Sequence, residues 1–166
     1  VADALDCVLR VGPLADSSLV ARLLGDIAFV NVASPAYLER HGIPQTPSDL
    51  DRHHMVLFAS PTTGRVEPFE WCEGSKVRTR RARGRVTVNN AEAMIAACLA
   101  GLGIIQIPAF DVREEIRSGA LTEILPGYPA EPMAAHLLFP RRRERTRRVL
   151  AFADWLEQLL TQRIWQ

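Results

Sequence analysis

The stretch VTVNNAEAMIAACLAGLGIIQIP, residues 86–108, decides the fold, because it predicts a capped helix that leads directly into a buried strand. Asn89 or Asn90 is of the type that caps helix N-termini, and Gly101 is typical of a helix end. Residues 102–107 then form a short, largely apolar run, as expected for a strand covered on both faces. The apolar face of the helix is predicted to contain Met94, Ile95, Cys98 and Leu99.

The rest of the chain repeats this alternation. Strands are predicted at residues 5–11, 27–33, 54–59, 102–107, 121–125 and 134–139, and a hairpin or meander is predicted over 69–88. Residues 19–33 contain two extended stretches separated by a break near Gly25-Asp26, and the strand at 27–33 is the second of them. Helices are predicted at residues 36–41, 48–52, 91–100, 109–117 and 145–160, and the last one is amphipathic, with the apolar residues Val149, Phe152, Leu156 and Leu159. Ser34-Pro35 is a typical helix start. Strands that alternate with helices indicate an α/β fold with mainly parallel pairing.

Composition excludes several classes of protein. The chain has 166 residues, 48% of them hydrophobic, with 20 Lys and Arg against 19 Asp and Glu. This is enough apolar material for a real core, and it argues against disorder and against a wholly basic nucleic-acid binder.

The three cysteines indicate a reducing compartment. Cys7, Cys72 and Cys98 are far apart and form no CxxC pair, so neither a disulfide framework nor a cysteine zinc site is expected. The chain starts with no secretory pattern, and no run reaches the ~18 apolar residues that span a bilayer. We expect a soluble, cytoplasmic protein with no membrane partner.

Catalytic motifs are missing from the sequence. The histidines are His41, His53, His54 and His136, and none stands in a metalloprotease spacing. We expect the His53-His54 pair to cap helix carbonyls. There is no nucleophile elbow, phosphate loop or dinucleotide fingerprint. No enzyme activity, metal or cofactor is predicted.

Several polar features could instead bind a ligand. Arg10 stands in an apolar strand, where it either faces solvent or meets an anion or an internal acid. Residues 60–64, SPTTG, follow a predicted strand, where ligands of open α/β sheets bind. The Asn89-Asn90 helix start offers free N–H groups. Two arginine clusters, residues 78–85 and 141–148, are interpreted as solvated faces or partner contacts rather than a nucleic-acid site, because no aromatic residues interleave with them.

Four segments in this order resemble the effector-binding domain of LysR-type transcriptional regulators. They are DCVLRVGPLADSSLVARLLG (6–25), ASPAYLERHGIPQTPSDLDRH (33–53), VTVNNAEAMIAACLAGLGIIQIP (86–108) and GALTEILPGY (119–128). The combination of AACLAGLGIIQIP with VREEIRSGALTEIL is especially specific. The resemblance covers the chain from Leu5 to about Leu160.

The resemblance implies a periplasmic-binding-protein-like fold: two Rossmann-like lobes joined by crossing strands, with a ligand cleft between them. The first lobe would be discontinuous, residues 1–30 and 133–166, and the second would be residues 31–132. Family members begin with a winged helix-turn-helix, a linker helix and an opening strand-helix-strand unit that this sequence does not show. We therefore expect a C-terminal part of a regulator with an incomplete first lobe. Its partners would be a small-molecule effector, an organic acid, and further copies in a homodimer or tetramer. DNA would be contacted only through the absent N-terminal domain.

The resemblance also implies which residues face the ligand. From the first lobe these are Leu9, Arg10, Val11 and Gly12; from the second they are Ser60, Pro61 and Thr62, with Val32, Ala33 and Ile107 lining the floor. The implied function is sensing a small anionic metabolite and thereby modulating DNA binding. A solute-binding protein of a transport system shares this architecture and stays the alternative. An enzyme of another type and direct DNA binding through the arginine clusters are further hypotheses.

Overall fold

The helix expected after the two asparagines is α2, Ala91–Leu99. Asn90, not Asn89, caps it, since its Oδ1 accepts a hydrogen bond of 2.8 Å from the backbone N–H three residues on. Gly101, with φ of 74°, follows the helix end in the left-handed conformation that glycine adopts readily. One detail of the predicted face is wrong: Leu99 is 40% exposed, and Ala97 is buried instead.

The computed structural model describes residues 6–12, 14, 19–61, 63–140 and 146–163. The chain divides into two units. Unit 1 consists of Val1–Ala28 and Pro132–Gln166, and unit 2 of Phe29–Glu131.

Unit 2 is built on a mixed sheet. Strand β4 pairs in parallel with β7, and a parallel bridge between Met55 and Ile104 joins β4 to the start of β8. Strand β3 pairs antiparallel with both β8 and β9. The strands are β3 (Phe29–Ala33), β4 (Val56–Phe58), β7 (Val86–Val88), β8 (Ile105–Pro108) and β9 (Thr122–Glu123).

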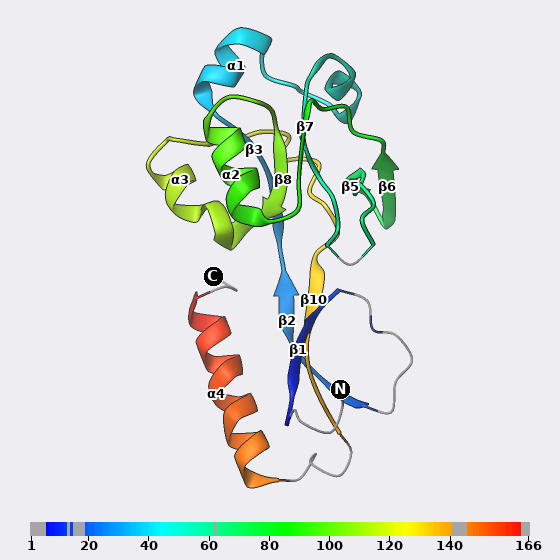
Figure 1. Ribbon diagram of the computed structural model, residues 1–166, viewed down its shortest axis with the longest axis vertical. Coiled ribbons are helices and arrows are strands. Elements are labelled where there is room, and N and C mark those ends of the chain that lie inside the picture. Colours follow the sequence, from blue (N-terminus) through cyan, green and yellow to red (C-terminus); the bar gives the residue numbers. More distant parts are fainter. Residues whose placement is uncertain (1–5, 13, 15–18, 62, 141–145, 164–166) are drawn as a thin grey trace. The chain divides into compact units, whose positions relative to one another are not determined.

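Short helices and one hairpin surround this sheet (Figure 1). They are α1 (Pro35–His41), the 3-10 helices η1 (Pro47–Arg52) and η2 (Ala109–Val112), α3 (Arg113–Arg117), and the hairpin of β5 (Phe69–Glu73) with β6 (Lys76–Arg80). Helix α2 packs across β3, β4, β7 and β8. Its Met94 and Cys98 meet Val32, Val56 and Ile107 in one core cluster. A second cluster gathers Tyr37, Leu50, Phe69 and Ile104.

Unit 1 contains a three-stranded antiparallel sheet and one helix. The sheet has the order β1 (Val8–Val11), β10 (Met133–Pro140), β2 (Leu19–Ile27), and α4 (Arg147–Arg163) packs on β2. Arg22 of β2 forms an ion pair of 2.7 Å with Asp154 of α4 and a second one with Glu157. The core of this unit consists of Leu24, Leu137, Phe139, Val149, Ala153 and Leu160.

Two expectations about the strands are wrong, and one is decided between its alternatives. Pairing is not mainly parallel, because several strands follow one another without the long crossover that parallel pairing needs; Gly74 and Ser75 alone connect β5 to β6. Of the hairpin or meander expected over residues 69–88, the hairpin of β5 and β6 is observed, and β7 pairs with β4 instead of extending it into a meander. Gly25 does not break β2: the β2–β10 register shifts there, so this glycine marks a bulge within the strand.

Two expectations about helices are also corrected. Ser34 stands at the N-cap position of α1, but its side chain makes no capping hydrogen bond. It is 3% exposed, and its Oγ has no hydrogen-bond partner among the residues that the structure describes. In α4, Phe152 does not belong to the buried face: it is 41% exposed, and its neighbour Ala153 is buried in the core instead.

Candidate functional site

The parallel strands of unit 2 bring three connections to one edge of the sheet. Because β4, β7 and β8 run in the same direction, their carboxyl ends meet at this edge. The turn at residues 60–64 follows β4, the start of α2 follows β7, and η2 follows β8. In open α/β sheets, ligands bind outside the carboxyl ends of the strands. This edge is the candidate ligand-binding edge of unit 2.

The turn after β4 is held by its own backbone. Gly64 N donates to Ser60 O at 2.7 Å, and Ser60 N donates to Arg65 O at 2.9 Å. At the base of the turn, Ala59 N donates to Val88 O of β7 at 2.7 Å. Half-buried Ser60 and exposed Pro61 therefore stand on a fixed support. The third predicted residue of this turn, Thr62, lies outside the described residues.

Two carboxylates modify the electrostatics of the same edge. Asp111 belongs to η2, and Glu92 lies in the first turn of α2. Burial, and secondly the charge of Glu92, raise the pKa of Asp111. The free N–H groups at the start of α2 favour negative charge, so the edge combines an anion-attracting helix end with two acids.

The predicted residues of unit 1 lie on strand β1 and directly after it. Leu9 is 48% and Val11 42% exposed, and Arg10 is exposed beside its register partner His136 on β10. Gly12 is buried, has φ of 90°, and donates its N–H to Ala134 O at 3.0 Å. Arg10 forms no ion pair with any carboxylate that the structure describes. The internal acid that was one possible partner of Arg10 is therefore not observed among the described residues.

The three residues expected to line the floor of the site lie in the cores of unit 2. Val32 and Ala33 are fully buried and Ile107 is 2% exposed. Val32 and Ile107 belong to the first core cluster, and Ala33 belongs to the second. Their side chains stabilise the sheet by excluding water, and they present no surface to a ligand.

The two neighbouring histidines are not helix caps, and this expectation is corrected. His53 is 5% exposed, and its Nδ1 lies 3.2 Å from the Tyr37 hydroxyl. Its backbone N–H, not its imidazole, bonds the end of η1. Burial first, and the charge of His41 second, lower the pKa of His53. No sequence pattern indicates this contact, because Tyr37 and His53 are brought together only by the packing of α1 on the residues that follow η1.

Reactive or metal-binding chemistry is not assembled in the part of the chain that the structure describes. No group there of three or more His, Cys, Asp and Glu side chains could hold a metal ion. The three cysteines are free, and burial raises the pKa of the Cys98 thiol to about 12. No described helix is long and apolar enough to cross a membrane.

Comparisons with known proteins agree with this arrangement. The LysR substrate binding domain family matches residues 1–161. The uncharacterized HTH-type transcriptional regulator YhjC of Escherichia coli (strain K12) is 48% identical over 156 residues, which are 93% of this chain and 52% of that protein. The regulatory domain of AphB from Vibrio vulnificus superposes with a TM-score of 0.76 at 30% identity, covering 93% of this chain and 79% of that one. The regulatory domain of CrgA, a LysR-type regulator from Neisseria meningitidis, superposes with a TM-score of 0.78 at 27% identity, covering 94% of this chain and 76% of that one.

The fold and the comparisons define a class: non-enzymatic effector-binding domains of transcription regulators with a periplasmic-binding-protein-like α/β fold. The chain belongs to the LysR substrate binding domain family. It spans about half the length of the curated relatives that it matches. The predicted family, fold class and lack of enzymatic activity are confirmed. The match to regulatory domains also favours a regulator over the transport alternative.

Proposed function

We propose that this chain senses a small organic anion for a DNA-binding transcription regulator, and that Ser60, Pro61 and Arg10 contribute to ligand binding. The observation that carries the proposal is the anchored turn after β4, which holds a half-buried hydroxyl at the edge where α/β sheets bind ligands. Arg10 supplies a guanidinium that no described carboxylate neutralises, and guanidinium groups bind carboxylates bidentately.

The remaining predicted positions follow from the same reasoning. Leu9, Val11 and Gly12 flank Arg10 and are proposed as neighbours of the ligand, and Thr62, which follows Pro61 in the sequence, is proposed as a further contact. Val32, Ala33 and Ile107 support the sheet beneath the edge. The regulator would act as a homodimer or tetramer and would contact DNA through a helix-turn-helix segment, in keeping with the names of its relatives. Effector binding would shift the population of its DNA-binding states.

Calorimetric titration of the chain with a panel of small mono- and dicarboxylates tests the proposal. Arg10→Gln removes a charge-assisted contact worth about 1.5–3 kcal/mol, so the Kd is expected to rise roughly ten- to hundredfold. Ser60→Ala removes one hydrogen bond and should raise the Kd about fivefold.

Two exposed residues provide matched controls. Arg147→Gln removes the same charge from α4, and Ser75→Ala removes a hydroxyl from the β5–β6 turn; neither should change the Kd more than twofold. Failure of every carboxylate to bind, or an equal loss in the controls, would contradict the proposal.

A further inference from the structure

Three exposed arginines stand at alternate positions of one segment of unit 2. After β6, exposure alternates from residue to residue over residues 81–85, and the chain bends at Arg85. Arg81, Arg83 and Arg85 are exposed, whereas Ala82 and Gly84 between them are half-buried. We call Arg81, Arg83 and Arg85 the arginine row.

The row is fixed to the sheet at its centre. Arg83 O accepts a hydrogen bond of 2.7 Å from Met55 N, next to β4. Gly84 lies so close to this strand that a Cβ would stand 2.1 Å from Met55 O and 2.8 Å from Leu57 Cγ. Ala82 packs against the second core cluster. The backbone at the centre of the row is therefore held in place, which lowers the entropy lost when the row binds a partner.

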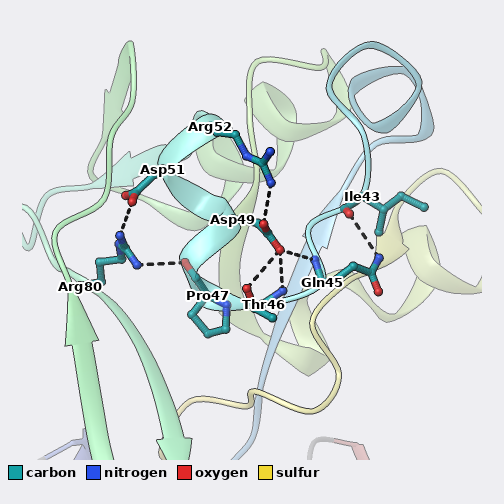
Figure 2. A network of polar contacts seen from close by, with 8 residues as sticks. All are labelled: Ile43, Gln45, Thr46, Pro47, Asp49, Asp51, Arg52 and Arg80. Atoms are coloured by element: carbon teal, nitrogen blue, oxygen red, sulfur yellow. Dashed lines mark hydrogen bonds and ion pairs between the residues drawn. The ribbon is translucent and has the colours of Figure 1, made fainter.

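The charges of the row are not neutralised by neighbouring acids. Figure 2 shows Arg80 turned to Asp51 and to the backbone oxygen of Pro47 at the end of the hairpin. Arg78 is paired with Glu73 at 2.9 Å. Within the described ranges, by contrast, no carboxylate forms an ion pair with any member of the row. Three adjacent unpaired guanidinium groups give this edge a positive potential.

We propose that the arginine row contacts the phosphate backbone of duplex DNA and adds a second, sequence-independent DNA contact to the regulator. Guanidinium forks bind phosphates bidentately, and three of them within five residues suit the closely spaced phosphates of a duplex. The segment 76–90 contains no aromatic residue, so the row lacks the buried aromatic anchors that dominate protein interfaces. The missing aromatic residues, which argued above against a nucleic-acid site, argue only against a site that stacks the bases of a single strand. Contacts with the phosphates of a duplex need no aromatic side chain.

This inference goes beyond the effector site, because it concerns exposed residues of another segment and needs no effector. It also changes the earlier interpretation of residues 78–85 as solvated. Arg78 and Arg80 have carboxylate partners within the protein, whereas the three members of the row do not.

Fluorescence anisotropy of the chain with a labelled 30-base-pair duplex of scrambled sequence, from 25 to 200 mM KCl, tests the proposal. The variant Arg81→Gln/Arg83→Gln/Arg85→Gln should bind at least tenfold more weakly at 50 mM KCl. Each phosphate contact contributes about 0.9 to the slope of log K against log salt, so this slope should become shallower by about 2 to 3. Arg81→Lys/Arg83→Lys/Arg85→Lys keeps the charge and should keep most of the slope.

The matched control, Arg52→Gln/Arg78→Gln/Arg117→Gln, removes the same net charge from arginines that have carboxylate partners. It should weaken binding less than threefold. The proposal is overturned if the unaltered chain does not bind at 25 mM KCl, or if row and control lose affinity equally. It is also overturned if the row supports binding to poly-L-glutamate but not to the duplex, which would indicate an acidic protein partner.

Discussion

The hydroxyl of Tyr37 is expected to hold α1 against His53 and His54, the two residues that follow η1, and Tyr37→Phe tests this directly. The ring is 1% exposed, so its packing is kept when only the oxygen is removed. The oxygen accepts a hydrogen bond of 2.8 Å from His54 N. It lies 3.2 Å from both His53 Nδ1 and His54 O, and it can donate to only one of them at a time because it carries one proton.

The expected loss of stability follows from these contacts. Tyr37→Phe removes the hydrogen bond that the hydroxyl accepts and the one that it donates, each worth about 1 kcal/mol net. The partly buried N–H of His54 is then left without its acceptor. We expect the free energy of unfolding of unit 2 to fall by about 2–3 kcal/mol. With a urea dependence of about 1–3 kcal/mol per molar, the midpoint should fall by roughly 1 M or more.

Urea titration can be confined to unit 2 by fluorescence. The chain has three tryptophans, so Trp155→Phe and Trp165→Phe leave Trp71 as the single reporter. Trp71 packs against the same core cluster as Tyr37. Tyr128→Phe is the matched control, because its hydroxyl has no described hydrogen-bond partner, and it should change stability by less than about 0.5 kcal/mol. A loss below about 0.5 kcal/mol for Tyr37→Phe, or equal losses for both variants, would refute the reasoning.

Three further results are expected from ionisable groups. Burial and the charge of His41 lower the pKa of His53 below its ordinary 6.5, so the unfolded state binds the proton more readily than the folded state. The free energy of unfolding should therefore fall as pH drops below about 6.5. His53→Asn should flatten this fall in urea titrations between pH 5 and 7.5. Burial and the charge of Glu92 raise the pKa of Asp111, so the stabilising contribution of this residue is lost as pH rises through that pKa. Asp111→Asn should increase the melting temperature at pH 7 and increase it less at pH 4. An equal increase at both pH values would argue against ionisation as the cause. The Cys98 thiol, with its pKa raised to about 12, should resist iodoacetamide at pH 8 until the chain unfolds, and fast alkylation of native protein, mapped by peptide mass spectrometry, would contradict its burial.

The local features of the fold could be predicted because short-range chemistry decides them. Pro35 and Gly42 mark the two ends of α1, and Asn90 and Gly101 mark those of α2. Each end depends on one residue's conformational preference or side-chain hydrogen bond.

The pairing partners of the strands could not be predicted from the sequence pattern. The apolar run at Val86–Val88 fits a meander and a parallel partner of β4 equally well, and only the three-dimensional packing chooses between them. In this arrangement Gly84 lies close to Met55, and the arginines on either side of it belong to the exposed arginine row. Tyr37 and His53 likewise meet only because α1 packs against the residues that follow η1, and no spacing rule describes this contact.

For the candidate site, the sequence located the loop but not the burial of its surroundings. The turn formers at residues 60–64 identified the connection after β4. The apolar residues Val32 and Ile107 have the same character whether they line a ligand site or fill a core, and their depth emerges only when β3 and β8 are paired. The acids Glu92 and Asp111 at the sheet edge were missed, because they come from different connections.

Hydrogen–deuterium exchange of the chain, with and without a saturating small carboxylate from the panel, tests the central claim most directly. If the turn after β4 contacts the effector, backbone amides at residues 60–65 should exchange more slowly with ligand present. Amides of the β5–β6 turn at Gly74 and Ser75, which is not part of the proposed site, should be unaffected. Unchanged exchange at residues 60–65 with a ligand that demonstrably binds would contradict the account, and it would place the effector elsewhere on the domain.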